Sequence, residues 1–301
     1  MIKAKTFFIL FILMIMITFL LSSIFYHINL TRTDNGIIKN NRFHKLSDSA
    51  YQDTQTIILG DSSAGNALDE ISYSKLAQAK TANLALTGSF GIVGTYNMLQ
   101  SGYSSFPQLK NVIIMQTLDI WWRPYSEEGN VETLKDIDEK ILNGYLAQLF
   151  NMNNIKFFLQ QYKNTIDPPF IENDFLSQNT NTYANGMKKF ETTWTIKNKI
   201  DPINLMYYKK IDDFCKIKSL KCIYIHGPLI KPLYENSVHE IQLIQTSLAS
   251  SSQNIIFHSD IILLDTNQTG DATDHVEKTM KQTIGNQFFA IIRNDLRNDS
   301  K

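Results

Sequence analysis

The chain begins with one long apolar stretch and continues with short apolar runs separated by polar segments. Phe7–Ile28 is almost continuously apolar, and its length matches the ~20 residues that a helix needs to cross a bilayer. Lys3 and Lys5 precede it, which by the positive-inside tendency keeps the amino terminus in the cytoplasm. We therefore expect residues 1–30 to be a single-pass signal anchor rather than a cleaved signal peptide, whose apolar core is usually shorter.

Residues 31–53 are polar, mixed in charge and without a period, so they predict a linker. From residue 54 to residue 301, short strand patterns alternate with helical ones. The expected strands are Ile57–Leu59, Thr81–Leu86, Asn111–Leu118 and Lys221–His226, and Asn254–Leu264 is expected to form a last strand or pair of strands. The expected helices are Asp69–Ala79, Ile92–Ser101, Ile203–Lys218, Asn236–Ser250 and His275–Leu296. This alternation predicts an α/β domain in which helices cover both faces of a parallel sheet of about five strands.

Residues from about 120 to 200 carry apolar positions at helical spacing and no strand pattern, so they predict a helical insertion. Such an insertion at the rim of the sheet would serve as a lid or an acceptor platform, or would be inert. Two cysteines, Cys215 and Cys222, flank a short turn after it. An exported domain can hold a disulfide there, and we favour it over two free thiols.

Composition narrows the possible functions. Basic and acidic residues balance at 29 each, so nothing favours a nucleic-acid surface. The sequence has no HExxH, Cys-x-x-Cys, P-loop or dinucleotide fingerprint, and we expect neither a metal nor a cofactor.

Candidate chemistry begins at Gly60-Asp61-Ser62, directly after the first strand. The sequence Gly-Asp-Ser is also a common turn and helix cap. Near the other end of the chain, Gly270–His275 places a histidine and two acids in one polar loop. A serine early in the chain, with an acid and a histidine late, is one workable order for a Ser-His-Asp triad.

On these residues the chain resembles the SGNH/GDSL hydrolase superfamily. The first motif corresponds to Gly60-Asp61-Ser62, the second to Asn83–Gly88 and the last to the acid and His275. The resemblance implies a flavodoxin-like three-layer α/β/α fold. It also implies a nucleophile at Ser62, a base at His275, and an oxyanion hole formed by the N–H groups of Ser62 and Gly88.

Two positions depart from the motifs. Relatives usually place the acid three residues before the histidine, where this chain has Ala272. Asp274 fits the N-cap of the terminal helix, so we prefer Asp271 as the orienting acid and keep Asp274 as the alternative. Relatives also offer an oxyanion-binding Asn where this chain has Leu118. The third donor therefore stays open among Thr117, Asn66 and a water.

Trp121 and Trp122 follow the third strand at the same rim of the sheet. Adjacent tryptophans on one element cannot both point into one core, so one of them could stack on a sugar ring. The alternative is that they pack the insertion onto the sheet.

Among relatives, the chain looks most like membrane-anchored envelope proteins that modify polysaccharides, such as those of alginate O-acetylation and teichoic-acid D-alanylation. This implies a serine esterase or O-acyltransferase, of the O-acetyl type, outside the cytoplasm (periplasmic side). It would act on a cell-surface glycan through an acyl-Ser62 intermediate, with a membrane-bound acyltransferase as partner if it transfers the acyl group. The alternative is a catalytically silent envelope protein that binds a glycan or assists assembly.

Overall fold

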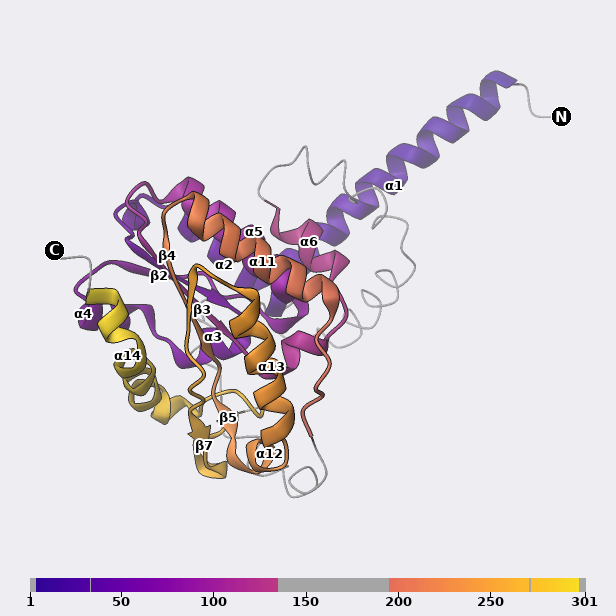
Figure 1. The fold of residues 1–301 in the computed structure, drawn as a ribbon. Helices are drawn as coiled ribbons and strands as arrows, with labels where there is room; N and C mark the ends of the chain where they lie inside the picture. Colours follow the sequence, from indigo (N-terminus) through magenta and orange to yellow (C-terminus); the bar gives the residue numbers. More distant parts are fainter. Residues whose placement is uncertain (1–3, 33, 135–194, 271, 298–301) are drawn as a thin grey trace.

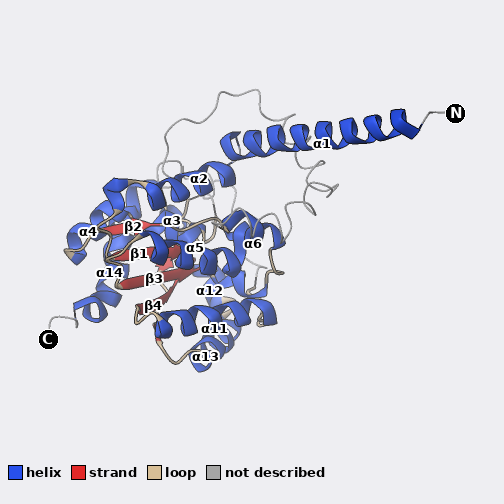
Figure 2. Cartoon of the chain, turned by 90° about the horizontal axis from the view of Figure 1, so that it is seen from above, coloured by secondary structure: helices blue, strands red, loops and turns tan. Residues whose placement is uncertain are grey.

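A computed structural model describes residues 4–32, 34–134, 195–270 and 272–297. Its centre is a parallel sheet whose strands lie in the order β2-β1-β3-β4-β6. The strands are β1 (Thr56–Gly60), β2 (Thr81–Asn83), β3 (Asn111–Gln116), β4 (Lys221–His226) and β6 (Ile255–Phe257). Figure 2 shows β2, β1, β3 and β4 side by side in this order. The expected α/β class and the parallel five-stranded sheet are confirmed.

Helices cover both faces of this sheet (Figure 1). On one face, alternate strand residues such as Leu59 and Ile114 pack against three helices. These helices are α5 (Gly91–Ser105), α11 (Pro202–Ile217) and α13 (Val238–Ser251). On the other face, the intervening residues such as Ile58 and Ile113 pack against three further helices. These are α3 (Ser62–Ala67), α4 (Glu70–Ala77) and α14 (Lys281–Arg297). Because side chains alternate between the faces of a strand, both faces of the sheet are buried.

Short elements complete the described chain. Two residues each from β5 (Leu229–Ile230) and β7 (Leu263–Leu264) form a separate parallel pair. The remaining short helices are α6 (Glu127–Thr133), α12 (Lys231–Glu235) and the 3₁₀ turns η1 (Ser49–Tyr51), η2 (Gly88–Phe90), η3 (Leu118–Trp122), η7 (Thr266–Gln268) and η8 (Lys278–Met280). Of the insertion expected over about 120–200, residues 135–194 lie outside the described residues.

The apolar run near the amino terminus lies in helix α1 (Ala4–Arg32), which projects away from the rest of the protein in Figure 1. Within the described ranges, no helix has the length and apolar character needed to cross a membrane.

The segment expected to be a linker is instead largely helical. Helix α2 (Asp34–Ser47) follows α1 and packs on the domain, with Ile38 and Leu46 buried. Its buried face also contains Lys39 and Arg42, which are only 4% and 3% exposed. No apolar helical period is visible in this segment because the charged residues Lys39 and Arg42 are part of the buried face, and their partners lie far away in the chain.

The two cysteines form the expected disulfide. Cys215 lies near the end of α11 and Cys222 lies in β4, and their Cα atoms are 6.2 Å apart. This separation falls within the ~4.4–6.8 Å that a disulfide requires. The bond ties α11 to β4, an interior strand of the sheet.

Candidate active site

Ser62 lies at the carboxyl edge of the sheet, where strand β1 turns into helix α3. Gly60 ends β1 with a φ of +139°, and a side chain there would overlap the carbonyl oxygen of Met115 in β3. Only glycine fits this turn. Ser62 is then the first residue of α3 and is partly exposed. Its own N–H group lies in the first turn, where a helix supplies no acceptor.

Asp61 holds this turn in place. Its carboxylate accepts from the N–H of Ser63 (3.0 Å), from the Ser63 hydroxyl (2.6 Å) and, across the sheet edge, from the N–H of Thr117 (2.8 Å). Burial, followed by the charge of Asp274, raises the pKa of Asp61 to about 7, although the bonds from Ser63 and Thr117 act in the opposite direction. Asp61 is therefore a structural acid that fixes the orientation of α3 and joins it to the end of β3.

Gly88 lies in the next loop, at the start of η2. The chain leading to it, from Asn83 to Leu86, continues beside β1: the N–H of Leu84 donates to Ile58 O, and the N–H of Leu86 donates to Gly60 O. Gly88 therefore lies at the same edge of the sheet as Ser62. The side chain of Arg123 packs directly against Gly88, and a methyl group on Gly88 would overlap Nη1 of that arginine.

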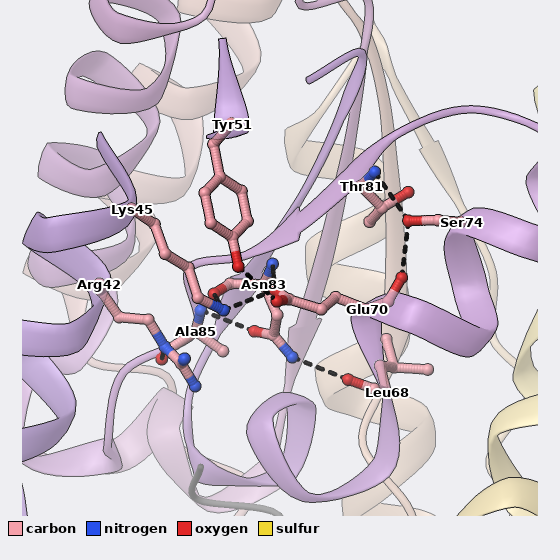
Figure 3. Close-up of polar contacts among 9 residues, drawn as sticks. All are labelled: Arg42, Lys45, Tyr51, Leu68, Glu70, Ser74, Thr81, Asn83 and Ala85. Atoms are coloured by element: carbon pink, nitrogen blue, oxygen red, sulfur yellow. Dashed lines mark hydrogen bonds and ion pairs between the residues drawn. The ribbon is translucent and has the colours of Figure 1, made fainter. Parts of the chain in front are cut away.

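A polar network anchors the Asn83–Gly88 segment to α2 and α4 (Figure 3). Glu70 in α4 accepts from the N–H of Asn83 at 2.8 Å and forms an ion pair with Lys45 of α2. Arg42 of α2 donates to the carbonyl of Ala85 at 3.0 Å. The side chain of Asn83 donates to the carbonyl of Leu68 and accepts from the N–H of Ala85. The main chain before Gly88 is therefore fixed by buried side chains rather than left as a flexible loop.

His275 lies in a loop that main-chain hydrogen bonds shape. Gly270 N–H donates to the His275 carbonyl (2.7 Å), and His275 N–H donates to the carbonyl of Ala272 (3.2 Å). The N–H of Ile230 in β5 donates to the carbonyl of Thr273 at 2.8 Å. The imidazole is partly exposed.

Two contacts bring this loop toward Ser62. Gly227, which follows β4, lies so close to Ser63 that a side chain on it would overlap the Ser63 hydroxyl. Three residues later, Ile230 holds Thr273 of the histidine loop. The charge of Asp274 also acts on Asp61, the neighbour of Ser62. The serine and histidine loops therefore lie at the same edge of the sheet.

Asp274 is not the cap of the terminal helix. The last helix starts later than expected, at Lys281, and Glu277 caps the preceding turn η8, where it accepts from the N–H of Thr279. Asp274 is instead buried, with 8% exposed, and burial raises its pKa against the lowering effect of His275 and Arg123. Asp274 cannot cap the helix because the turn 272–275 is followed by an extended segment, in which Val276 bridges to Thr269, before the helix begins. Asp271, the preferred acid, lies outside the described residues.

Trp121 does not fit the expected role of a sugar platform. It is fully buried, and its indole N–H donates to the hydroxyl of Tyr224 at 3.2 Å. The turn η3 directs it into the core, whereas Trp122 is only partly buried at the edge of that core. Of the two tryptophans, Trp122 is the one that reaches the surface.

The donors expected to complete the oxyanion hole have other partners. Leu118 is buried and apolar, with 2% exposed. Thr117 gives its N–H to Asp61 and its hydroxyl to Asp119, and Asn66 donates its side-chain amide to the Ser62 carbonyl at 2.8 Å. Sequence reasoning missed Arg123, the cation against Gly88, because nothing in the Trp-Trp-Arg-Pro sequence indicates where its side chain lies.

Two other histidines, His226 and His258, contribute to the structure of the domain. His226 ends β4 fully buried among aromatic rings, and this burial lowers its pKa to about 3. It is therefore neutral at physiological pH and shielded from a substrate. His258 lies 2.8 Å from Asp295 of α14 and links that helix to the sheet. In the described part of the chain, no group of three or more acids, histidines and cysteines is arranged to hold a metal ion.

Comparison with known proteins gives no family assignment. No protein-family model matches the chain, and no curated protein matches it.

Proposed function

We propose that the protein is a serine esterase or O-acyltransferase of the cell envelope that acts on an ester, of the O-acetyl type, of a cell-surface glycan. The observation that carries this proposal is that the loop with Ser62 and the loop with His275 both lie at the carboxyl edge of a parallel sheet and are joined through the segment Gly227–Ile230. In open α/β sheets, ligands bind at this edge where the strand order reverses, and β1 lies at that reversal here.

The geometry supports a covalent mechanism. Ser62 attacks the acyl carbon while His275 takes the hydroxyl proton, and the carbonyl electrons move to the oxygen. His275 then returns the proton to the leaving alcohol as the ester C–O bond breaks. Water or a sugar hydroxyl completes the cycle by the reverse steps, so hydrolysis and transfer differ only in the acceptor. Asp271, with Asp274 as the alternative, orients the imidazole.

The fold and the location form part of the same proposal. The strand order β2-β1-β3-β4-β6 is the flavodoxin-like order, and we infer a flavodoxin-like three-layer α/β/α domain. The membrane anchor and the extracytoplasmic location rest on the apolar run Phe7–Ile28 and the two lysines before it. A membrane-bound acyltransferase as partner rests on the resemblance alone.

A fluorophosphonate probe tests the nucleophile, with the neighbouring serine as a matched control. We expect the probe to label the wild-type protein and not Ser62→Ala. Ser63→Ala should still be labelled, because the Ser63 hydroxyl is buried and bonded to Asp61. Labelling that survives Ser62→Ala would exclude Ser62 as the nucleophile.

A catalytically silent glycan-binding or assembly protein is the second candidate. It is favoured by the buried apolar Leu118 where relatives present a donor. The absence of labelling in folded wild-type protein would support it.

A further inference from the structure

Arg123 holds a guanidinium group at the rim of the candidate site. It follows η3, and its side chain lies over Gly88. A methyl group built on Gly88 would overlap Nη1, whereas Cζ would lie 3.3 Å away and Nη2 3.7 Å away. Nη1 is therefore the guanidinium atom closest to this methyl position, and the N–H group of Gly88 is attached to the same Cα atom.

Asp119 fixes the orientation of this guanidinium. Nε of Arg123 donates to Oδ2 of Asp119 at 3.0 Å, and Nη2 donates to the same oxygen. Nη1 donates to no residue that the structure describes. The Arg123 side chain as a whole is 42% exposed. A planar group held along one edge by a carboxylate presents its other N–H groups in a defined direction.

The charge of Arg123 acts on both loops of the site. Burial acts to lower the pKa of Arg123, but the carboxylate of Asp119 raises it above its usual value. Smaller contributions in the same direction come from Asp61 and Asp274, which precede Ser62 and His275 in the chain. A positive charge so placed would stabilise a negative charge formed between the two loops. The nearby polar candidates, Thr117 and Asn66, donate elsewhere.

We propose that Arg123 is a catalytic residue whose Nη1 donates to the oxyanion formed when Ser62 attacks an ester. This inference rests on the proposed function. As the bond from Ser62 Oγ to the acyl carbon forms, the Ser62 proton passes to His275 and the carbonyl electrons pass to oxygen. That oxygen accepts hydrogen bonds from the N–H groups of Ser62 and Gly88 and from Nη1. When the intermediate collapses, the C–O bond to the alcohol breaks and His275 protonates the leaving oxygen.

The test uses p-nitrophenyl acetate, a neutral ester, with Arg123→Met. Methionine keeps the packing against Gly88 and removes every donor. Because removing one oxyanion-hole donor typically costs 10²–10³ in rate, we expect kcat to fall by about 10²–10³ while KM changes less than about threefold. Arg123→Lys should recover part of the loss, and added guanidinium should partly rescue Arg123→Ala. A purely structural role would not be rescued in this way.

Lys80→Ala is the matched control, because it removes the same charge just before β2, at the opposite edge of the sheet. Its kinetics should equal those of the wild type. Unchanged kcat in a folded Arg123→Met variant would overturn the inference while Ser62 labelling leaves the proposed function intact. A loss confined to KM for an anionic ester would also overturn it and would assign Arg123 to substrate recognition. If Ser62 is not labelled in the wild type, the proposed function itself fails.

Discussion

The two loops of the candidate site are built in different ways. The serine loop, Gly60–Asn66, is fixed by side chains: three buried donors converge on Asp61, and Asn66 donates to the Ser62 carbonyl. The histidine loop, Gly270–Glu277, is fixed mainly by main-chain bonds and by the buried side chain of Val276. The conformation of the serine loop therefore depends on particular side chains, whereas the conformation of the histidine loop depends mainly on main-chain hydrogen bonds.

This difference separates the two buried acids. Asp61 uses its carboxylate to hold structure, since each of its oxygens accepts from a buried donor. Asp274 accepts no side-chain or main-chain hydrogen bond from another residue in the described ranges, and it interacts with its surroundings through charge. Asp61 therefore makes the serine loop a rigid platform, whereas Asp274 has no such structural role in the histidine loop.

The largest expected effect concerns the acid that orients His275. Replacing an orienting Asp by Asn cost about 10⁴ in kcat in a serine protease, equivalent to about 5.4 kcal/mol of transition-state stabilisation. We expect Asp271→Asn to lower ester turnover by a similar factor at near-normal Tm. Asp274→Asn should keep turnover within about tenfold, because the carboxylate of an adjacent residue is poorly placed to reach Nδ1 of its neighbour. The reverse result would assign the role to Asp274.

The second effect tests the side-chain construction of the serine loop. Asp61→Ala leaves three buried donors without an acceptor, at about 1–3 kcal/mol each, partly offset because a buried carboxylate is also removed. We expect a loss of about 3 kcal/mol in the free energy of unfolding, or roughly 6–12 °C in Tm. Asp48→Ala is the control, because Asp48 is likewise an N-cap, that of the 3₁₀ turn η1, but its carboxylate accepts from one main-chain donor near the surface. Equal losses in the two variants would show that Asp61 is an ordinary cap.

Much of the platform could be predicted from the sequence, and the reasons are local. A buried run that ends in Gly-Asp-Ser requires a strand, a turn and a helix start, and that is what Gly60 and Asp61 form. The disulfide also followed from two cysteines across a short turn. In these places the residues that decide the structure are neighbours in the chain.

What could not be predicted depends on distant partners. Helix α2 buries Lys39 and Arg42 because Glu132 and the carbonyl of Ala85 accept from them, 93 and 43 residues away. Trp121 is buried because η3 turns it toward Tyr224 on the neighbouring strand. No local pattern specifies such pairs, and the same holds for the contact of Arg123 with Gly88.

The third effect is a change in how stability depends on pH. The pKa of Asp61 is raised from 3.8 to about 7, so the folded state binds its proton more tightly than the unfolded state. The contribution of Asp61 to the free energy of unfolding is therefore present below about pH 4 and is lost as pH rises toward about 7. After burial, the charge of Asp274 is the second-largest cause of the raised pKa of Asp61, and the pKa of Asp274 is itself raised.

Asp274→Asn should therefore make the loss of stability between pH 4.5 and pH 7.5 smaller by about 1 kcal/mol, measured by urea unfolding at each pH. Asp213→Asn, on the exposed face of α11, is the control and should follow the wild type. Parallel curves for Asp274→Asn and the wild type would mean that the two loops are not electrostatically coupled.

The smallest effect tests the main-chain construction of the histidine loop. Thr273 holds the loop to β5 through its carbonyl group, which accepts from Ile230, and no hydrogen bond of its hydroxyl is seen among the described residues. Thr273→Ala should then change the free energy of unfolding by less than about 0.5 kcal/mol. Thr117→Ala is the contrasting variant at the serine side, because the Thr117 hydroxyl bonds both the carboxylate and the N–H of Asp119, and about 1 kcal/mol should be lost. If Thr273→Ala were the more destabilising of the two, the histidine loop would depend on side chains after all, and the contrast between the loops would not hold.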